Sequence, residues 1–529
     1  MWGSNAREAH PIFFHHVLKG IRHGAKLFVV DPRRTSTAEW ADTHLPLNVG
    51  TDIELALGVA RELIVQGLVD RDFISHATTG YAEFEAHAMP WTLERTSEVT
   101  GVTVEAIRAL AHAYGRAQRA QICWTLGITE HHNAVDNVLS LIHLALLTGH
   151  VGREGSGLNP LRGQNNVQGG GDMGALPHKL PGFQDVEDDE IRGRYEALWG
   201  ATIPPKKGWH LTQMFEAMGR NELRTVLVMG ENPAQSEADV GHARQLLEGL
   251  DGLVVMDLFL TRTAKMAHVV LPSAAAWVET EGTVTNSERR VQRCRKALDP
   301  PGEAKSDVWI LAQLARRLGV DLGEPTGEEL WDELRLLSPM HRGMSWSRLE
   351  ANDGLQWPCP DESHPGTPFL HGRLWERPVS GMLAPFTVVQ PEGPVDQLTH
   401  EYPIRLTTGR RLDEYNTGVQ TNQYRNPMRR RETVDVSPGD ARALGLAEGD
   451  RARITSRRAS VTCLVHVDDG LTPGLAFMTY HDADDVDTNL LTIEAIDPKA
   501  GTAEFKATAV RIEREGTHGS PSSERPAHA

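Results

Sequence analysis

The amino-acid sequence predicts an α/β protein with two doubly wound α/β domains followed by a C-terminal β-barrel. Two stretches of the chain alternate short apolar strands, turns and helices, which is the pattern of parallel sheets with crossover helices. Beyond about residue 403 short strands and turns follow one another, as in a small barrel. We expect, in order, an α/β domain at 1–160, a second at 161–320, an extended linker at 321–400, the barrel at 401–515 and a disordered tail at 516–529.

The first domain opens on a turn at Gly3 and a helix over 11–23 that begins with Pro11. The apolar run at 26–30 predicts a strand that ends at Asp31. The further elements expected here are helices at 51–67 and 103–120, a strand at 121–124, a turn at Gly127 and an apolar helix at 134–148. A parallel unit needs a strand before its first turn. None precedes Gly3, so we expect that the sequence is cut or begins at an internal Met.

The second domain repeats this pattern. Its expected elements are strands at 225–229, 253–256 and 268–272 and a helix at 237–249. The turn at 230–232 resembles the turn at 3–5, and Asp257 ends a strand as Asp31 does. Two similar strand ends suggest two copies of a nucleotide-like ligand, because ligands of open α/β sheets bind at the carboxyl ends of strands. The alternative is a chance likeness between short turns.

Asp31 is the first candidate binding residue. A carboxylate at a strand end can accept two hydrogen bonds from a ribose or from a guanine edge, and Arg33 and Arg34 lie within reach of phosphates. The alternative is that Asp31 and Pro32 only end the strand and the arginines are solvated. Neither a GxGxxG motif nor a P-loop occurs at these turns, which excludes the ordinary dinucleotide and ATP fingerprints.

The segment 156–186 is rich in Gly, Asn, Gln and Pro and predicts a long ordered loop, and such loops are usually functional. Within it, the run from Asn159 to Gly174 combines consecutive amides with Arg162. Arg162 would offer a forked cation to a carboxylate. The alternative is a flexible polar loop.

Composition narrows the possible partners. The chain has 529 residues and a formal net charge of -17, which argues against nucleic acid as a partner because phosphate backbones require excess Lys and Arg. No stretch approaches the roughly 20 apolar residues of a membrane span. Four cysteines lie far apart with no CxxC pair, so we expect reduced or buried thiols and no metal site built from this chain: Cys123, Cys294, Cys359 and Cys463.

Two polar clusters are interpreted as surface features and not as metal sites. Adjacent His131 and His132 point apart and lack a third ligand, which favours a surface pair over a metal site. The acidic stretch at 481–485 lacks an EF-hand pattern, which favours a solvated loop.

Several motifs in order resemble the molybdopterin oxidoreductase superfamily over residues 1 to about 512. They are Gly3 to Pro11, Val30 to Arg33, Gly230 to Pro233, Leu271 to Ser273, and Asn286 to Gln292 after Glu281-Gly282-Thr283. The run Asn159 to Pro177 is similar to the large (alpha) subunit of formate dehydrogenases in particular. The resemblance implies the molybdopterin oxidoreductase fold, N-terminally truncated, in which each α/β domain holds one pterin dinucleotide and the barrel caps both.

The resemblance also implies a site. By position, the residues that would line the pterin dinucleotides are Asn5, Asp31, Arg33, Gly127, Gly230, Asn232, Asp257, Ser273, Asp307, Arg410, Tyr415, Asn489 and Lys506. Arg162 would hold formate beside the metal. The cofactor would be bis-molybdopterin guanine dinucleotide with Mo or W, whose four sulfur ligands suit a soft metal. Formate would be oxidised to CO2, and electrons would pass to subunits that carry iron–sulfur clusters or flavin, in the cytoplasm or, after export, in the periplasm.

The sequence departs from the family in two ways. The family carries a 4Fe–4S cysteine cluster and a metal-ligating Cys or selenocysteine upstream of the opening motif, and this sequence holds neither. We therefore expect the cluster only in a missing N-terminal part, and we expect this chain alone to be inactive. The hypothesis for the loss of that part is a selenocysteine codon read as a stop. Glu414 stands where formate dehydrogenases often carry His. The alternatives are a nitrate or S- or N-oxide reductase, and a non-catalytic pterin-binding fragment.

Overall fold

The structure, a computed structural model, describes residues 1–412, 414–418 and 431–516. Two units make it up. The first consists of Met1–Val395 with Glu494–Glu504, and the second begins at Asp396, leaves out that returning segment and resumes at Phe505. From residue 517 onward the expected disordered tail lies outside the described residues.

The first sheet of the larger unit is parallel. Its strands are β1 (Phe28–Val30), β2 (Thr43–Leu45), β4 (Gln121–Trp124) and β5 (Gly157–Pro160). Trp2 forms parallel bridges to Val30 of β1 and to Trp124 of β4. Its backbone N–H donates to Cys123 O at 2.8 Å, and that of Gly3 donates to Val30 O at 2.8 Å. Trp2 alone thus occupies the strand position between β1 and β4, where the sequence pattern lacks a strand.

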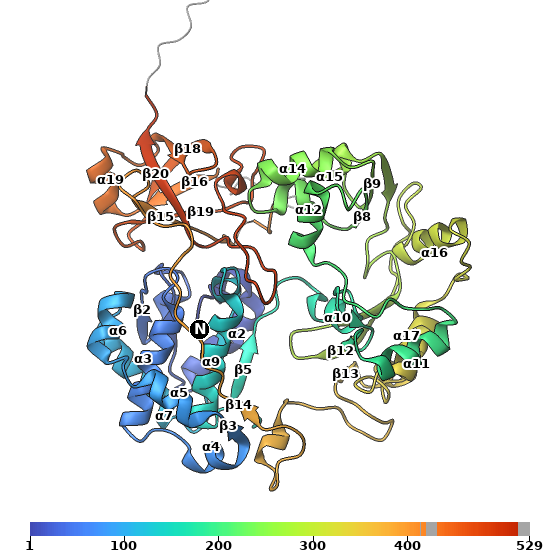
Figure 1. Cartoon of the computed structure of the whole chain (residues 1–529), viewed down its shortest axis with the longest axis horizontal. Coiled ribbons are helices and arrows are strands. Elements are labelled where there is room, and N and C mark those ends of the chain that lie inside the picture. The colour runs from blue at the N-terminus through green and yellow to red at the C-terminus, as the bar shows by residue number, and fades with distance from the viewer. Residues whose placement is uncertain (413, 419–430, 517–529) are drawn as a thin grey trace, which may run out of the picture. The chain divides into compact units, whose positions relative to one another are not determined.

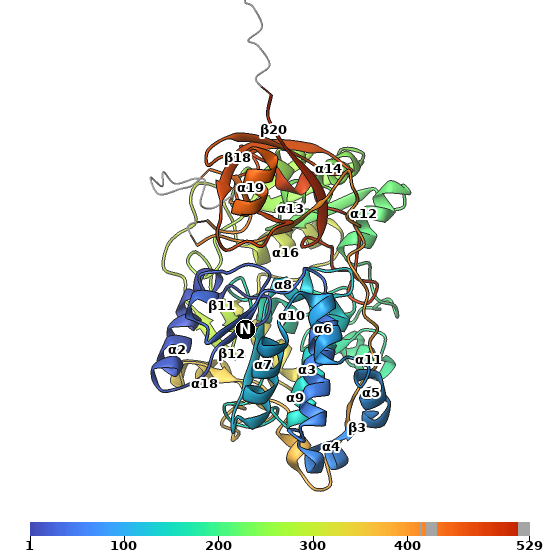
Figure 2. The ribbon, with the colours of Figure 1, turned by 90° about the vertical axis from the view of Figure 1, so that its left-hand side faces the viewer.

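Helices cover this sheet. They are α1 (Ala6–Ala9), α2 (Pro11–Arg22), α3 (Asp52–Val65), α4 (Arg71–Ala77), α5 (Tyr81–Ala88), α6 (Leu93–Thr100), α7 (Val104–Arg116), α8 (Leu126–Thr129) and α9 (Ala134–Thr148), with a short 3-10 turn at Ala38–Trp40. α3 packs against both α7 and α9 (Figure 2). Leu55, Leu63, Ile107, Leu141 and Leu147 are fully buried among them. α9 has the bounds expected from the sequence because apolar residues surround its axis, as in a core helix.

The second sheet has the strand order β10-β9-β8 and is also parallel. Its elements are β8 (Thr225–Met229), β9 (Gly252–Asp257) and β10 (Val269–Pro272), with α12 (Leu211–Gly219), α13 (Pro233–Ser236), α14 (Val240–Glu248) and α15 (Arg262–Met266) beside it (Figure 1). Val226 and Val228 of β8 point into this core with Leu253 and Val255 of β9. All three strands follow the sequence prediction closely, because β-branched runs between turns leave few other structures.

Two segments carry more regular structure than expected. The predicted loop at 156–186 contains β5, α10 (Val167–Asp172), β6 (Lys179–Leu180) and β7 (Gln184–Asp185), and α11 (Asp189–Trp199) follows. The predicted extended linker at 321–400 contains α17 (Gly327–Leu337), α18 (Trp346–Ala351), β13 (Leu355–Gln356), a 3-10 turn at Gly372–Trp375 and β14 (Ala384–Pro385), which pairs with β3 (Thr78–Thr79). Thr326 and Glu329 form a capping box at α17, which is a local signal that the sequence interpretation overlooked.

The helices at 321–400 form because they have a core of their own. Trp331 of α17 and Trp346 of α18 are buried with Val291 of β12. They pack on a small antiparallel sheet of β11 (Gly282–Thr285), β12 (Arg290–Cys294) and β13. α16 (Asp307–Arg317) precedes them. Trp331 and Trp346 are therefore core residues, since each buries a large apolar area.

The second unit is a closed six-stranded barrel with the order β15-β19-β16-β18-β17-β20. Its elements are β15 (Ile404–Thr408), β16 (Thr433–Val436), α19 (Pro438–Leu444), β17 (Arg451–Thr455), β18 (Ser460–Val467), β19 (Leu475–Met478), a 3-10 turn at Thr488–Leu490 and β20 (Thr508–Arg514). Closure leaves no unpaired strand edge. The sequence prediction of mixed α/β structure with a C-terminal barrel is confirmed. Over the described residues, no helix has the length and apolarity that crossing a membrane requires.

Candidate functional site

The turns after Trp2 and after β4 lie against each other. Gly127 N–H donates to Gly3 O at 3.2 Å, and the Thr125 hydroxyl donates to the same oxygen at 2.8 Å. A Cβ atom on Gly3 would lie 2.8 Å from the carbonyl carbon of Gly127, and Gly3 has φ of +55°. Both the close approach and the left-handed backbone require glycine here. The backbones of the two glycines thus lie in direct contact at the carboxyl edge of the first sheet, and we call this contact the glycine cradle.

Asn5, Asp31 and Arg33 stand at this same edge. The side-chain oxygen of Asn5 accepts from the hydroxyls of Ser36 at 3.2 Å and Thr37 at 2.8 Å. Asp31 follows β1 directly and is 8% exposed, and its carboxylate accepts from Arg33 N–H at 3.0 Å. The carboxylate therefore forms a turn that ends the strand and also lies where strand ends converge.

The loop with Arg162 leaves the same edge. It begins where β5 ends, and Leu161 N–H donates to Trp124 O at 2.9 Å. A ring nitrogen of His10 lies 2.7 Å from Arg162 O. The Arg162 side chain is exposed, and its Nε donates to Gln168 Oε1 at 3.0 Å. Parallel strands thus bring the candidate catalytic arginine to the edge that carries the glycine cradle.

The second sheet has a comparable carboxyl edge. Gly230 follows β8 with φ of +63°, Asp257 ends β9, and Ser273 follows β10. Asn232 is 8% exposed, and its side-chain oxygen accepts from the backbone N–H and the hydroxyl of Thr263 at 3.1 and 2.8 Å. The structure therefore brings together the four residues that the sequence placed at three separate strand ends.

Carboxylates concentrate at this second edge. Burial raises the pKa of Asp257 above its ordinary value, and the charge of Asp307 adds to the rise. Burial, with the neighbouring carboxylate of Glu231, raises the pKa of Glu237 to about 8. Glu231 is itself a group whose pKa burial raises. Acids in this environment favour the protonated form, in which they can donate a hydrogen bond.

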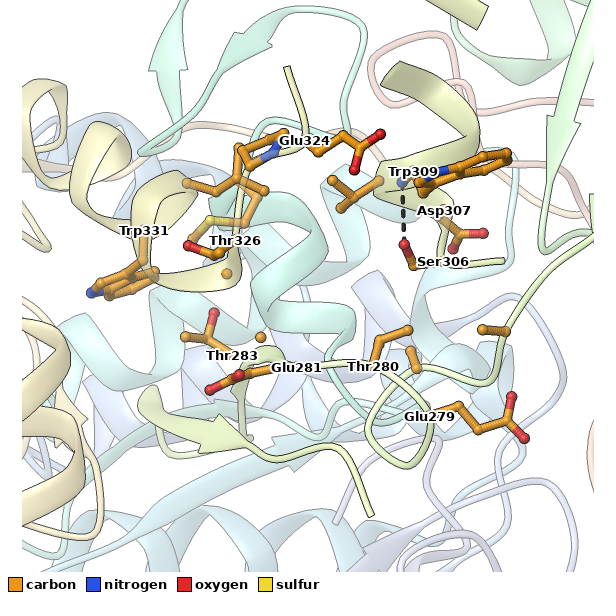
Figure 3. Close-up of a pocket in the computed structure, with 18 of the residues that line it drawn as sticks. Glu279, Thr280, Glu281, Thr283, Ser306, Asp307, Trp309, Glu324, Thr326 and Trp331 are labelled. Carbon is orange, nitrogen blue, oxygen red and sulfur yellow. Dashed lines mark hydrogen bonds between the residues drawn. The ribbon is translucent and has the colours of Figure 1, made fainter. Parts of the chain in front are cut away.

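Asp307 also lines a cavity of about 560 Å³ (Figure 3). The cavity lies between the segment before β11 and the first turns of α16 and α17. The Ser306 hydroxyl accepts from Trp309 N–H at 3.2 Å and so caps α16 beside Asp307. The polar residues around the cavity are Glu279, Thr280, Glu281, Thr283, Ser306, Asp307, Glu324 and Thr326. Apolar side chains, among them Met173, Leu330 and Leu334, and the aromatic Trp309 and Trp331 complete its lining.

The remaining candidate residues lie in the barrel unit. The Arg410 guanidinium lies 4.9 Å from the ring centroid of Tyr415. Lys506 is 6% exposed, and its Nζ donates to Thr408 O at 3.1 Å, at the end of β15. Asn489 is 3% exposed, on the 3-10 turn at 488–490. Glu414, the departure from the family pattern, is 5% exposed, and its backbone oxygen accepts from Arg410.

Buried polar atoms at both sheet edges lack partners among the residues that the structure describes. They are Ser4 Oγ at the first edge, and Ser273 Oγ and Asp307 Oδ1 at the second. A buried polar atom without a hydrogen bond costs about 1–3 kcal/mol. Together with the glycine cradle, these atoms fit a polar ligand with hydrogen-bonding groups, such as a pterin dinucleotide, at each edge.

The expectation of a surface histidine pair is wrong. His131 is 3% exposed, and one of its ring nitrogens lies 3.2 Å from Oε2 of Glu504, which also accepts from His132 N–H at 3.1 Å. The two histidines hold the pKa of the Glu504 carboxyl well below its usual range, against the opposing effect of burial. The partner comes from the returning segment, hundreds of residues later, so no local pattern indicated it.

Two other expectations concern the cysteines and the acidic stretch at 481–485. The four cysteines are free thiols, and three of them are buried, as predicted. In the acidic stretch, Asp484 and Asp485 are exposed but His481 is buried, so only part of it is a solvated loop. Over the ranges 1–412, 414–418 and 431–516, no group of three or more His, Cys, Asp or Glu residues could hold a metal ion.

The family described as molybdopterin oxidoreductase matches residues 1–317, and the molydopterin dinucleotide binding domain matches residues 404–509. The F420-dependent formate dehydrogenase 2 subunit alpha of Methanococcus maripaludis is 41% identical over 519 residues, which cover 97% of this chain and 76% of that protein. The assimilatory nitrate reductase catalytic subunit of Bacillus subtilis is 32% identical over 96% of this chain and 73% of its own length.

A solved structure agrees in fold. Acetylene hydratase from Pelobacter acetylenicus superposes with a TM-score of 0.70 at 20% identity, over 95% of this chain and 75% of that one. This likeness concerns the fold alone. The two family matches and the long alignment with the M. maripaludis subunit show that this chain belongs to the molybdopterin oxidoreductase family.

Proposed function

We propose that this chain is the catalytic-subunit portion of a formate dehydrogenase, which oxidises formate to CO2. The observation that carries the proposal is Arg162, an exposed guanidinium on a loop that leaves the sheet edge next to the glycine cradle. A forked cation matches a carboxylate in shape and charge. The M. maripaludis relative, a formate dehydrogenase subunit by name, supports the same substrate.

The residues at the two edges fit a bis-molybdopterin guanine dinucleotide with Mo or W. Asp31 and Asp257 would each accept hydrogen bonds from a guanine or ribose group of the cofactor. The hydroxyls of Ser4 and Ser273 would each donate a hydrogen bond to the cofactor. The remaining contacts proposed at these edges come from Asn5, Arg33, Gly127, Gly230, Asn232 and Asp307. In the barrel unit they come from Arg410, Tyr415, Asn489 and Lys506. When bound, the metal would supply a two-electron acceptor.

The chain's own part in the reaction is binding and orientation. Oxidation of formate breaks its C–H bond and releases two electrons and one proton. Arg162 would bind the two carboxylate oxygens and thereby fix the direction of the C–H bond. The electrons would leave through iron–sulfur clusters to partner subunits, which carry such clusters or flavin. The printed name of the M. maripaludis relative, subunit alpha, supports a multi-subunit assembly.

A second function is favoured by specific observations. The B. subtilis relative is a nitrate reductase by name, and Glu414 replaces the His that formate dehydrogenases often carry. Nitrate is a planar anion that an arginine fork would also bind. The protein would then reduce nitrate, or an S- or N-oxide, at the same edge.

The test is viologen-dye kinetics with the assembly purified from its native cells. We expect formate-dependent dye reduction, and Arg162→Ala should lower kcat/KM for formate by about a hundredfold or more, since charged hydrogen bonds contribute about 1.5–3 kcal/mol each. Nitrate-dependent oxidation of reduced dye without formate activity would replace the proposal with the second function. Bound pterin with neither activity would leave only a pterin-binding role.

A further inference from the structure

Within the described part of the chain, one nitrogen of the Arg162 guanidinium makes a hydrogen bond. Its Nε donates to Gln168 Oε1 at 3.0 Å. Among the described residues, no hydrogen bond of either terminal nitrogen accompanies this one. An arginine held through Nε keeps the two parallel N–H groups that a bidentate carboxylate contact requires. The way in which Gln168 holds Arg162 therefore decides which donors face a substrate.

The orientation of the Gln168 amide follows from its two neighbours. Its Nε2 donates to Asp172 Oδ1 at 2.9 Å, while its Oε1 accepts from Arg162. Arginine can only donate, so a flipped amide would place an NH2 group against another donor. The assignment of oxygen and nitrogen in this amide is thus fixed by chemistry.

Asp172 anchors this pair from the interior. It is 1% exposed, and its second oxygen accepts from Trp357 Nε1 at 2.8 Å. Trp357 lies 185 residues later in the chain, directly after β13. Arg289 holds Trp357 in turn, with its guanidinium 5.2 Å from the ring centroid and a hydrogen bond to the Trp357 carbonyl. The anchor therefore rests on packed structure outside the loop.

We propose that Gln168 is a positioning residue for Arg162, held in one orientation by Asp172 and Trp357, so that the terminal NH2 groups of Arg162 point at the carboxylate of the substrate. This inference rests on the proposed function of Arg162 as the carboxylate-binding group. An exposed arginine otherwise loses side-chain entropy when it becomes ordered. Gln168 removes part of that cost before the substrate arrives.

The experiment compares Gln168→Ala with the matched control Gln245→Ala, an exposed glutamine on α14. KM and kcat for formate are measured separately in the native assembly. A second readout does not depend on turnover: formate protects Arg162 from phenylglyoxal, and peptide mass spectrometry gives the half-protecting concentration. For Gln168→Ala we expect KM and that concentration to rise together by about tenfold, with a smaller change in kcat, and no change in the control.

Gln168→Glu supplies a signature that a structural role would not produce. The introduced carboxyl would face Asp172, and two close carboxyls share a proton at low pH. We expect its KM for formate to fall toward the wild-type value as pH is lowered, because the shared proton restores the link to Asp172. If Gln168→Ala does not fold, Trp357→Phe keeps an aromatic side chain of smaller size, removes the N–H donor and should raise KM about threefold.

The possible outcomes separate the two claims. Unchanged KM and unchanged protection in Gln168→Ala would overturn the positioning role, even if the melting temperature of the variant fell. If the wild-type assembly does not oxidise formate, the proposed function fails. Protection of Arg162 from phenylglyoxal by carboxylate anions still tests whether its two terminal NH2 groups bind an anion. Weaker protection in Gln168→Ala would then support positioning of Arg162 for another anion.

Discussion

The two parallel sheets present similar turns at their carboxyl edges but stabilise them differently. At the first edge, Gly3 packs directly on Gly127, with no space for a side chain. At the second, Gly230 faces open space, and the edge depends on Asn232, whose side chain ties it to Thr263. The same short motif can therefore be fixed by backbone contact in one place and by a buried amide in another.

The difference extends to charge. The first edge leads into the Arg162 loop, whereas the second gathers Glu231, Glu237 and Asp257, whose pKa values burial raises. An edge beside an exposed arginine and an edge rich in carboxyl groups differ in the charge that they present to a ligand. In the proposed function, the first edge would bind the substrate carboxylate beside Arg162, and at the second edge Asp257 would accept hydrogen bonds from a guanine or ribose group.

The largest expected effect is the difference in local stability between alanine substitutions at Gly3 and at Gly230. Gly3→Ala should strongly destabilise the first edge, because its Cβ would lie 2.8 Å from the Gly127 backbone. Gly230→Ala should cost only the left-handed backbone strain of about 1–2 kcal/mol. Hydrogen–deuterium exchange of peptides from each sheet measures both. We expect a loss of protection of about a hundredfold in β1 and β4 for the first variant. Equal losses in the two variants would contradict this account.

An intermediate effect separates the two asparagines. Asn232→Ala leaves the fully buried Thr263 without its acceptor and should cost about 2 kcal/mol in local stability of β8 and β9. Asn5→Ala removes contacts from two hydroxyls at a less buried position and should cost about 1 kcal/mol. The same exchange experiment reports both. Asn232→Asp, which keeps the acceptor, serves as the control, and a larger cost for Asn5→Ala would reverse the comparison.

A further effect depends on pH. Glu237 holds its proton up to about pH 8 when folded, whereas its ordinary pKa is 4.5, so the stability that it contributes falls as pH rises through that window. Glu237→Gln stays neutral and should be more stable than wild type at pH 9 by a few kcal/mol, with much less difference at pH 5. Urea unfolding at both pH values measures this. Glu248→Gln, an exposed change on α14, should show no such pH dependence.

The elements predicted well from the sequence are those with strong local patterns. The bounds of α9 and the strands β4, β8, β9 and β10 follow from apolar runs between turn residues. The helices within 321–400 were missed because tryptophans and prolines obscured a helical period, although the capping box at Thr326 was readable. Glu504, the partner of His131, lay beyond any local pattern.

By itself, the sequence determined the fold class, the strand ends that carry Asp31 and Asp257, and the loop that carries Arg162, because these depend on short-range periodicity and turn chemistry. Only the tertiary structure decided that Gly3 rests on Gly127, and that Asp172 and Trp357 hold Gln168 against Arg162. These contacts join residues that are far apart in the chain. Their geometry arises from packing and from the need of buried polar groups for partners, which local sequence does not encode.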